Sequence, residues 1–106
     1  MIAKDKRVIM GRTKSYKEHL LKRLKNPTEA ALYLNAALED EDPRIFLVAL
    51  KNVTEAQGGM SKIAEEAHLN RQSLYRTLSN KGNPKLTSVI SILSSLGMEI
   101  QIRPAV

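Results

Sequence analysis

Apolar side chains recur every three or four residues along most of this 106-residue chain. This spacing is typical of helices that bury one face. The pattern is interrupted at Asn26-Pro27, at Asp42-Pro43 and at Gly58-Gly59. An Asn or Asp followed by proline is typical of a helix start, and a glycine pair is typical of a helix end. The first half of the chain is therefore predicted to form three helices, one from about Tyr16, one from Pro27 to about Leu38 and one from about Pro43 to Gln57.

Residues 60–80 fit two short helices joined by a tight turn. Ile63 and Ala67 lie one helical turn apart in the first helix, and Leu74 and Leu78 form the corresponding inward pair in the second. Burial of the two leucines turns polar residues of the second helix toward solvent, namely Arg71, Gln72, Tyr75 and Arg76. Arg can pair with the edge of guanine and Gln with that of adenine, so the segment is a candidate helix-turn-helix for the major groove. Two amphipathic helices around a turn also occur in proteins that never bind DNA, and this alternative stays open.

The residues after the candidate motif divide into a loop, a helix and an alternating segment. The loop is Lys81–Pro84, and the helix runs from Leu86 to Leu96 before Gly97. Residues 98–103 alternate apolar and polar side chains, which predicts a short β-strand. A single strand in a helical domain needs a partner for its backbone groups.

Antiparallel pairing of this strand with the same strand of a second copy would form a two-fold dimer. The dimer strand would present Met98, Ile100 and Ile102. Such a dimer would place two reading helices roughly 34 Å apart, which matches a palindromic operator. A frayed tail, or pairing with residues 7–10, is the alternative.

Charge is distributed unevenly along the chain, whose net charge is +6. Residues 1–27 carry nine Lys and Arg but two acidic residues, whereas residues 28–42 carry five acidic residues and no Lys or Arg. Basic ends around an acidic middle favour a polyanionic partner. Residues 1–14 are predicted to be a basic, flexible N-terminal arm, and residues 15–106 a single domain. Residues 39–42 fit either a solvated, cap-rich loop or an acidic patch for a basic protein.

Composition argues against several classes of protein. The chain has no cysteine, and His19 and His68 lie 49 positions apart, which excludes disulfides and predicts no metal site. No nucleophile–base pair or Gly-rich phosphate loop is present, so we expect no enzyme and no cofactor. No apolar run is long enough for a membrane span, and no signal peptide is evident, so a cytoplasmic protein without a membrane partner is expected.

A set of short motifs resembles a known family over roughly residues 28–103. They are Tyr33-Leu34-Asn35-Ala36-Ala37-Leu38-Glu39, Asp42-Pro43, Phe46-Leu47-Val48-Ala49-Leu50, Gly59-Met60-Ser61-Lys62-Ile63-Ala64, Ser73-Leu74-Tyr75-Arg76, Gly82-Asn83-Pro84 and Leu96-Gly97-Met98. In this order they resemble the Cro/lambda-repressor-type (XRE-like) helix-turn-helix group. Within that group the chain is similar to the addiction-module antidote proteins, the antitoxins of toxin–antitoxin systems.

The resemblance implies an all-α fold, namely a five-helix lambda-repressor-like DNA-binding domain with a short C-terminal β-strand. It also implies a homodimer on double-stranded DNA, repression of its own operon, and a small basic toxin partner, typically a RelE-like ribonuclease. A stand-alone prophage-type transcriptional regulator without a toxin is the alternative function.

The resemblance also implies roles for individual residues. Base contacts would come from Asn70, Arg71, Gln72 and Arg76, and phosphate contacts from Ser61, Lys62, Ser73, Tyr75, Asn80 and Lys81. Two positions depart from the group: His68 stands where the turn usually has glycine, and Thr77 where a larger apolar residue is common. We expect a positive φ and a strain of up to about 1 kcal/mol at His68. The tilt of the second motif helix depends on how Leu78 compensates for Thr77.

Overall fold

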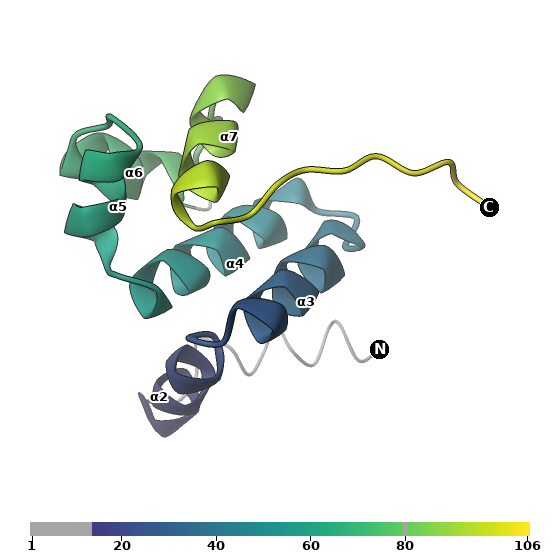
Figure 1. Ribbon diagram of the computed structural model, residues 1–106, viewed down its shortest axis with the longest axis horizontal. Helices are drawn as coiled ribbons and strands as arrows, with labels where there is room; N and C mark the ends of the chain where they lie inside the picture. Colours follow the sequence, from purple (N-terminus) through teal and green to yellow (C-terminus); the bar gives the residue numbers. More distant parts are fainter. Residues whose placement is uncertain (1–13, 80) are drawn as a thin grey trace.

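The computed structural model describes residues 14–79 and 81–106 (Figure 1). Within these ranges the protein has six α-helices and no β-strand. The helices are α2 (Lys14–Arg23), α3 (Pro27–Leu38), α4 (Pro43–Ala56), α5 (Met60–Glu66), α6 (Arg71–Thr77) and α7 (Leu86–Ser95). The all-α class is confirmed, but the expected five helices with a C-terminal strand are wrong. The resemblance implied five helices, whereas the structure has six, because residues 14–23 form a further helix, α2. The apolar pattern near Tyr16 predicted this helix.

The predicted helix starts are confirmed at α3 and α4. The Asn26 side chain accepts hydrogen bonds from the amides of Thr28 and Glu29, at 2.8 and 3.1 Å. Asp42 accepts one from the amide of Arg44 at 3.0 Å. Each cap is followed by a proline in the first turn, where the missing N–H has no helical partner to lose. Local sequence therefore fixes where these helices begin.

The core is built around α4, which contacts α2, α3 and α5, while α5 also contacts α6 and α7. The largest fully buried side chains of the core are mostly branched aliphatic ones: Leu24, Leu50, Val53, Ile63, Leu74, Leu78 and Ile92, together with Thr54. Burying one such aliphatic side chain stabilises a fold by roughly 1.5–3 kcal/mol. Because Leu74 and Leu78 belong to this cluster, the core itself sets the orientation of α6.

Two polar contacts tie distant parts of the chain together. The buried Asn52 side chain donates a 2.9 Å hydrogen bond from Nδ2 to the Tyr33 hydroxyl, which links α4 to α3. Gln57 Nε2 donates to the Leu24 carbonyl oxygen at 3.0 Å and so anchors the residues after α2 to the end of α4. Burial raises the pKa of the Tyr33 hydroxyl, although the hydrogen bond from Asn52 partly opposes this.

The predicted strand at residues 98–103 is not formed. The Met98 amide donates to the Leu93 carbonyl oxygen at 2.9 Å, and the chain then continues in extended, irregular form to its C-terminus. Figure 1 shows this segment leaving the helical body as a single tail. A strand requires a hydrogen-bonded neighbour, and the described part of this chain offers none. The alternative partner, residues 7–10, lies outside the described residues.

None of the helices in the described ranges has the length and apolar character needed to cross a bilayer.

Candidate nucleic-acid interface

The turn between α5 and α6 is tight and has the backbone conformation expected at His68. Its φ is +60°, and no other non-glycine residue of the described ranges has a positive φ. The Leu69 amide donates to the Ala64 carbonyl oxygen at 2.8 Å, which closes the end of α5. Ala67 is buried and Leu69 half-buried, so the turn is held against the core. The positive φ predicted for His68 is confirmed.

Helix α6 has one buried and one exposed side, as its leucine spacing predicted. Leu74 and Leu78 have no exposed surface, whereas Arg71, Gln72 and Arg76 are all exposed. The structure therefore places three of the four predicted base-contacting residues together on one solvent-facing ridge, called here the α6 ridge. Thr77 is half-buried beside the fully buried Leu78, so Leu78 supplies the apolar contact at this end of the helix.

Asn70, the fourth predicted base-contacting residue, has a structural role as well. It is the N-cap of α6, and its Oδ1 accepts a hydrogen bond from the Ser73 amide at 2.7 Å. The cap uses the side-chain oxygen and the Ser73 backbone donor, which leaves the Asn70 Nδ2 group and the Ser73 hydroxyl for any other contact. The predicted cap is confirmed, and the base contact stays a prediction.

Two cations contributed by different helices lie near the Tyr75 ring. The Arg71 guanidinium carbon is 5.6 Å from the centroid of the Tyr75 ring, and Lys51 Nζ of α4 is 5.9 Å from the same centroid. Both distances lie within the range of cation–π attraction. The contact restrains Arg71 and brings Lys51 to the margin of the α6 ridge. The sequence did not predict Lys51 as a residue of this site. The one feature that could have indicated it is its position as a lone cation in the apolar middle of residues 43–57.

Of the predicted phosphate-contacting residues, Ser73 and Tyr75 belong to α6 itself, Ser73 half-buried and Tyr75 exposed, and three others lie in the elements before and after it. Ser61 and Lys62 are exposed in the first turn of α5, and Lys81 is exposed in the loop after α6. This loop packs closely on the end of α6, since a Cβ built at Gly82 would lie 2.4 Å from the Thr77 carbonyl oxygen. Asn80 lies outside the described residues. Ser61, Lys62 and Lys81 thus add donors and positive charge to the surface of α5 and of the loop after α6, while Glu65 and Glu66 are exposed at the end of α5.

The acidic segment 39–42 has a structural role at the other end of the molecule. The Asp40 carboxylate accepts from the Asp42 amide at 2.9 Å, and Asp42 pairs with Arg44 at 2.8 Å. This pairing raises the pKa of Arg44 above its ordinary value. Of the two interpretations of this segment, the cap-rich loop is the one whose contacts are present. No group of three or more metal-ligating side chains occurs among residues 14–79 and 81–106.

Comparison with known proteins identifies the family. The model of a family described as "Probable addiction module antidote protein" matches residues 13–104. An uncharacterized protein of Haemophilus influenzae is 34% identical over 80 residues, which cover 76% of this chain and 81% of the relative. No solved structure matches the chain significantly. The protein therefore belongs to the family of probable addiction module antidote proteins.

Proposed function

We propose that this protein is the antitoxin of a toxin–antitoxin module and that it represses its own operon by binding DNA through α6. Membership of the antidote family supports the antitoxin role. The observation that carries DNA binding is the α6 ridge, on which Arg71, Gln72 and Arg76 are exposed because Leu74 and Leu78 are buried. A helix that offers these side chains is suited to the major groove, in the manner of Cro- and lambda-repressor-type proteins.

The residues around the ridge would then divide by role. Arg71 and Gln72 would contact base edges at the start of α6, and Arg76 one turn later. Phosphate contacts would come from residues of α6 and of the neighbouring elements: Ser61, Lys62, Ser73, Tyr75 and Lys81, with Lys51 added by the contact through Tyr75. Contacts to phosphates set position and affinity, whereas contacts to bases set specificity.

Two partners complete this function. A homodimer would present two copies of α6 to a palindromic operator, and a small basic toxin of the RelE-like kind would be the protein that is neutralised. The alternative is a stand-alone regulator without a toxin. Co-expression with the adjacent reading frame separates the two, because an antitoxin relieves growth arrest caused by its neighbour and a stand-alone regulator does not.

Binding to the promoter region of its own gene, measured beside scrambled DNA at several salt concentrations, tests the DNA-binding role. Arg71→Ala and Gln72→Ala should each weaken operator binding by about 1–3 kcal/mol while affecting scrambled DNA less. Lys81→Ala should weaken both DNAs alike and reduce the salt slope by about one. Arg44→Ala removes the same charge at the start of α4, away from α5 and α6 (Figure 1), and serves as the control. Equal losses on both DNAs for the first two variants would rule out base reading by α6.

A further inference from the structure

Two side chains one turn apart on α4 place α2 and α6 along the same side of this helix. Lys51 Nζ lies 5.9 Å from the centroid of the Tyr75 ring of α6. The Glu55 carboxylate pairs with Lys17 Nζ of α2 at 3.2 Å. Residues four apart lie on one face of a helix. The side of α4 that adjoins the α6 ridge therefore also adjoins α2.

A second set of contacts joins the end of α2 to the start of α5. Gln57 Nε2 donates to the Leu24 carbonyl oxygen at 3.0 Å, so Lys25, the next residue, follows directly on this contact. The chain turns into α5 at the same place, and the Lys62 side chain lies over that turn, since a Cβ built at Gly58 would be 3.0 Å from Lys62 Cδ. Figure 1 shows α2 below the end of α4 from which the chain enters α5. The end of α2 thus continues the surface formed by the first turn of α5.

The exposed surface of α2 and of the residues after it is strongly basic. Residues 14–25 carry five Lys and Arg and one acidic residue. Lys17 is paired with Glu55, and Arg23 lies 3.8 Å from Glu29. Three exposed lysines have no ion pair with any carboxylate of residues 14–79 or 81–106, namely Lys14, Lys22 and Lys25. Such a cluster of unneutralised cations attracts a polyanion.

We propose that the basic end of α2, defined by Lys22 and Lys25, contacts DNA phosphates beyond the base pairs that α6 reads. This inference rests on the proposed function and extends it to a helix outside the helix-turn-helix. Each strand of a duplex carries one phosphate per roughly 3.4 Å of axis, so a strand held at the first turn of α5 presents its next phosphates to neighbouring cations. Contacts to phosphates add affinity and position but carry no base information. The two lysines would thus lengthen the contact without changing the sequence that is read.

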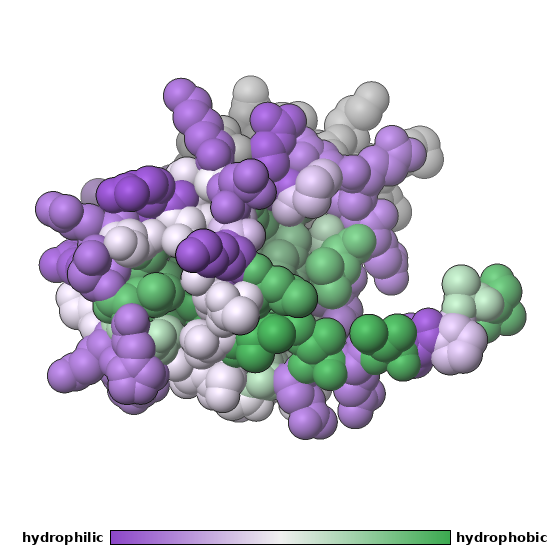
Figure 2. Space-filling model, turned by 90° about the horizontal axis from the view of Figure 1, so that it is seen from above, coloured by the Kyte–Doolittle hydropathy of each residue, from purple (hydrophilic) through white to green (hydrophobic). Residues whose placement is uncertain are grey.

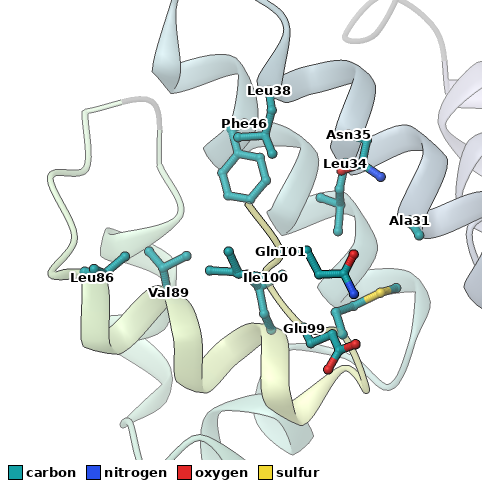
Figure 3. Close-up of a pocket in the computed structure, with 12 residues that line it drawn as sticks. Ala31, Leu34, Asn35, Leu38, Phe46, Leu86, Val89, Glu99, Ile100 and Gln101 are labelled. Atoms are coloured by element: carbon teal, nitrogen blue, oxygen red, sulfur yellow. The ribbon is translucent and has the colours of Figure 1, made fainter. Parts of the chain in front are cut away.

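Charge favours DNA over a basic toxin as the partner of this surface. An unneutralised basic surface repels a basic protein, whereas it binds phosphates and releases their counterions. The main apolar groove among the described residues lies elsewhere: it measures 310 Å³ and is lined by α3, α4, α7 and the tail. Figure 3 shows Phe46, Val89 and Ile100 in this groove, and in Figure 2 the apolar surface continues onto the tail. The basic end of α2 is separate from that surface, because α2 contributes no residue to the groove.

Salt titration of lysine variants tests the contact. Lys22→Ala and Lys25→Ala should each reduce the slope of log K against log salt by about one, on the promoter fragment and on scrambled DNA alike. Each should bind about three- to fivefold more weakly near 0.15 M salt, and the double variant should lose about two from the slope. The double variant K22R/K25R keeps both charges and should keep the wild-type slope. Arg44→Ala, at the start of α4, is the control for loss of one charge elsewhere. Wild-type slopes for both alanine variants would overturn the proposal.

The length of the DNA tests where the contact falls. Hydroxyl-radical footprinting on the promoter fragment should show that the double variant K22A/K25A loses protection only at the outermost positions of the wild-type footprint. A duplex trimmed of those positions should bind the wild type as weakly as it binds the double variant. An unchanged footprint, or an equal loss by both proteins on trimming, overturns the proposal. If Arg71→Ala and Lys81→Ala weaken binding while the α2 variants do not, this inference fails and the proposed function stands. A wild-type chain that binds neither DNA overturns both.

Discussion

Replacing Asn70 separates the stability of α6 from its proposed contact with DNA. The Asn70 Oδ1 accepts the Ser73 amide at 2.7 Å and is the side-chain cap of a helix only seven residues long. Asn70→Ala removes this acceptor and exposes the amide to water without a fixed partner. Loss of an N-cap side chain costs about 1 kcal/mol, within a range of roughly 0.5–2 kcal/mol. For a chain of this length, that loss lowers Tm by about 4 °C.

Asn70→Ser provides the matched variant. A serine hydroxyl can accept the same amide, so the stability of Asn70→Ser should stay within about 0.3 kcal/mol of the wild type. Serine lacks the Asn70 Nδ2 donor. If that donor contacts a base, Asn70→Ser binds the operator more weakly despite its normal stability. If Asn70 acts as a cap alone, Asn70→Ser binds like the wild type and Asn70→Ala binds more weakly in proportion to its fraying.

Urea unfolding followed by far-UV circular dichroism measures the stability of both variants, and operator titration measures their binding. An Asn70→Ala protein as stable as the wild type would refute the capping argument. An Asn70→Ser protein as unstable as Asn70→Ala would show that the loss has a cause other than the missing acceptor.

Three further substitutions test other parts of the fold. His68→Gly should stabilise the protein by up to about 1 kcal/mol in urea unfolding, because glycine accepts a positive φ without strain, and a loss of stability would contradict this. Gly82→Ala should destabilise by about 1–3 kcal/mol, because its Cβ would lie 2.4 Å from the Thr77 carbonyl oxygen and 2.8 Å from that of Arg76; a variant as stable as the wild type would refute the steric argument. Tyr33→Phe should cost about 1–3 kcal/mol at neutral pH, because Asn52 Nδ2 loses its acceptor. Burial raises the Tyr33 pKa, so its favourable contribution is complete below pH 10 and is lost as pH rises through the raised pKa. Above pH 10 the free energy of unfolding of Tyr33→Phe should therefore fall less steeply with pH than that of the wild type. Equal slopes for the two proteins would contradict this.

The features that the sequence predicted correctly depend on residues close together in the chain. Asn26 and Asp42 cap helices two or three residues away, and Leu74 and Leu78 share a face because they lie one turn apart. Such caps and faces are fixed by spacing alone, so the pattern of apolar and polar residues is sufficient to find them. The positive φ of His68 was instead expected from the resemblance to a group whose turn has glycine at this position.

The features that the sequence could not predict depend on packing between distant segments. The approach of Lys51 to the Tyr75 ring requires the relative placement of α4 and α6, for which no local pattern exists. The hydrogen bond from Asn52 to Tyr33 likewise joins residues 19 positions apart. Residues 98–103 have the alternation of a strand, but alternation describes the faces of a segment and cannot supply a neighbour to pair with. The tail is therefore extended without forming a ladder within this chain.

The brevity of α5 and α6 has a consequence for how operator occupancy responds to unfolding. Each helix is seven residues long, and isolated helices below about 12–15 residues barely form in water. The α6 ridge therefore depends on the packed leucines beneath it. An unfolded molecule therefore keeps no part of the α6 ridge. Under the proposed function, the number of molecules able to repress then equals the number of folded molecules. Under this function, unfolding or degradation of the protein would therefore release the operator completely rather than by degrees.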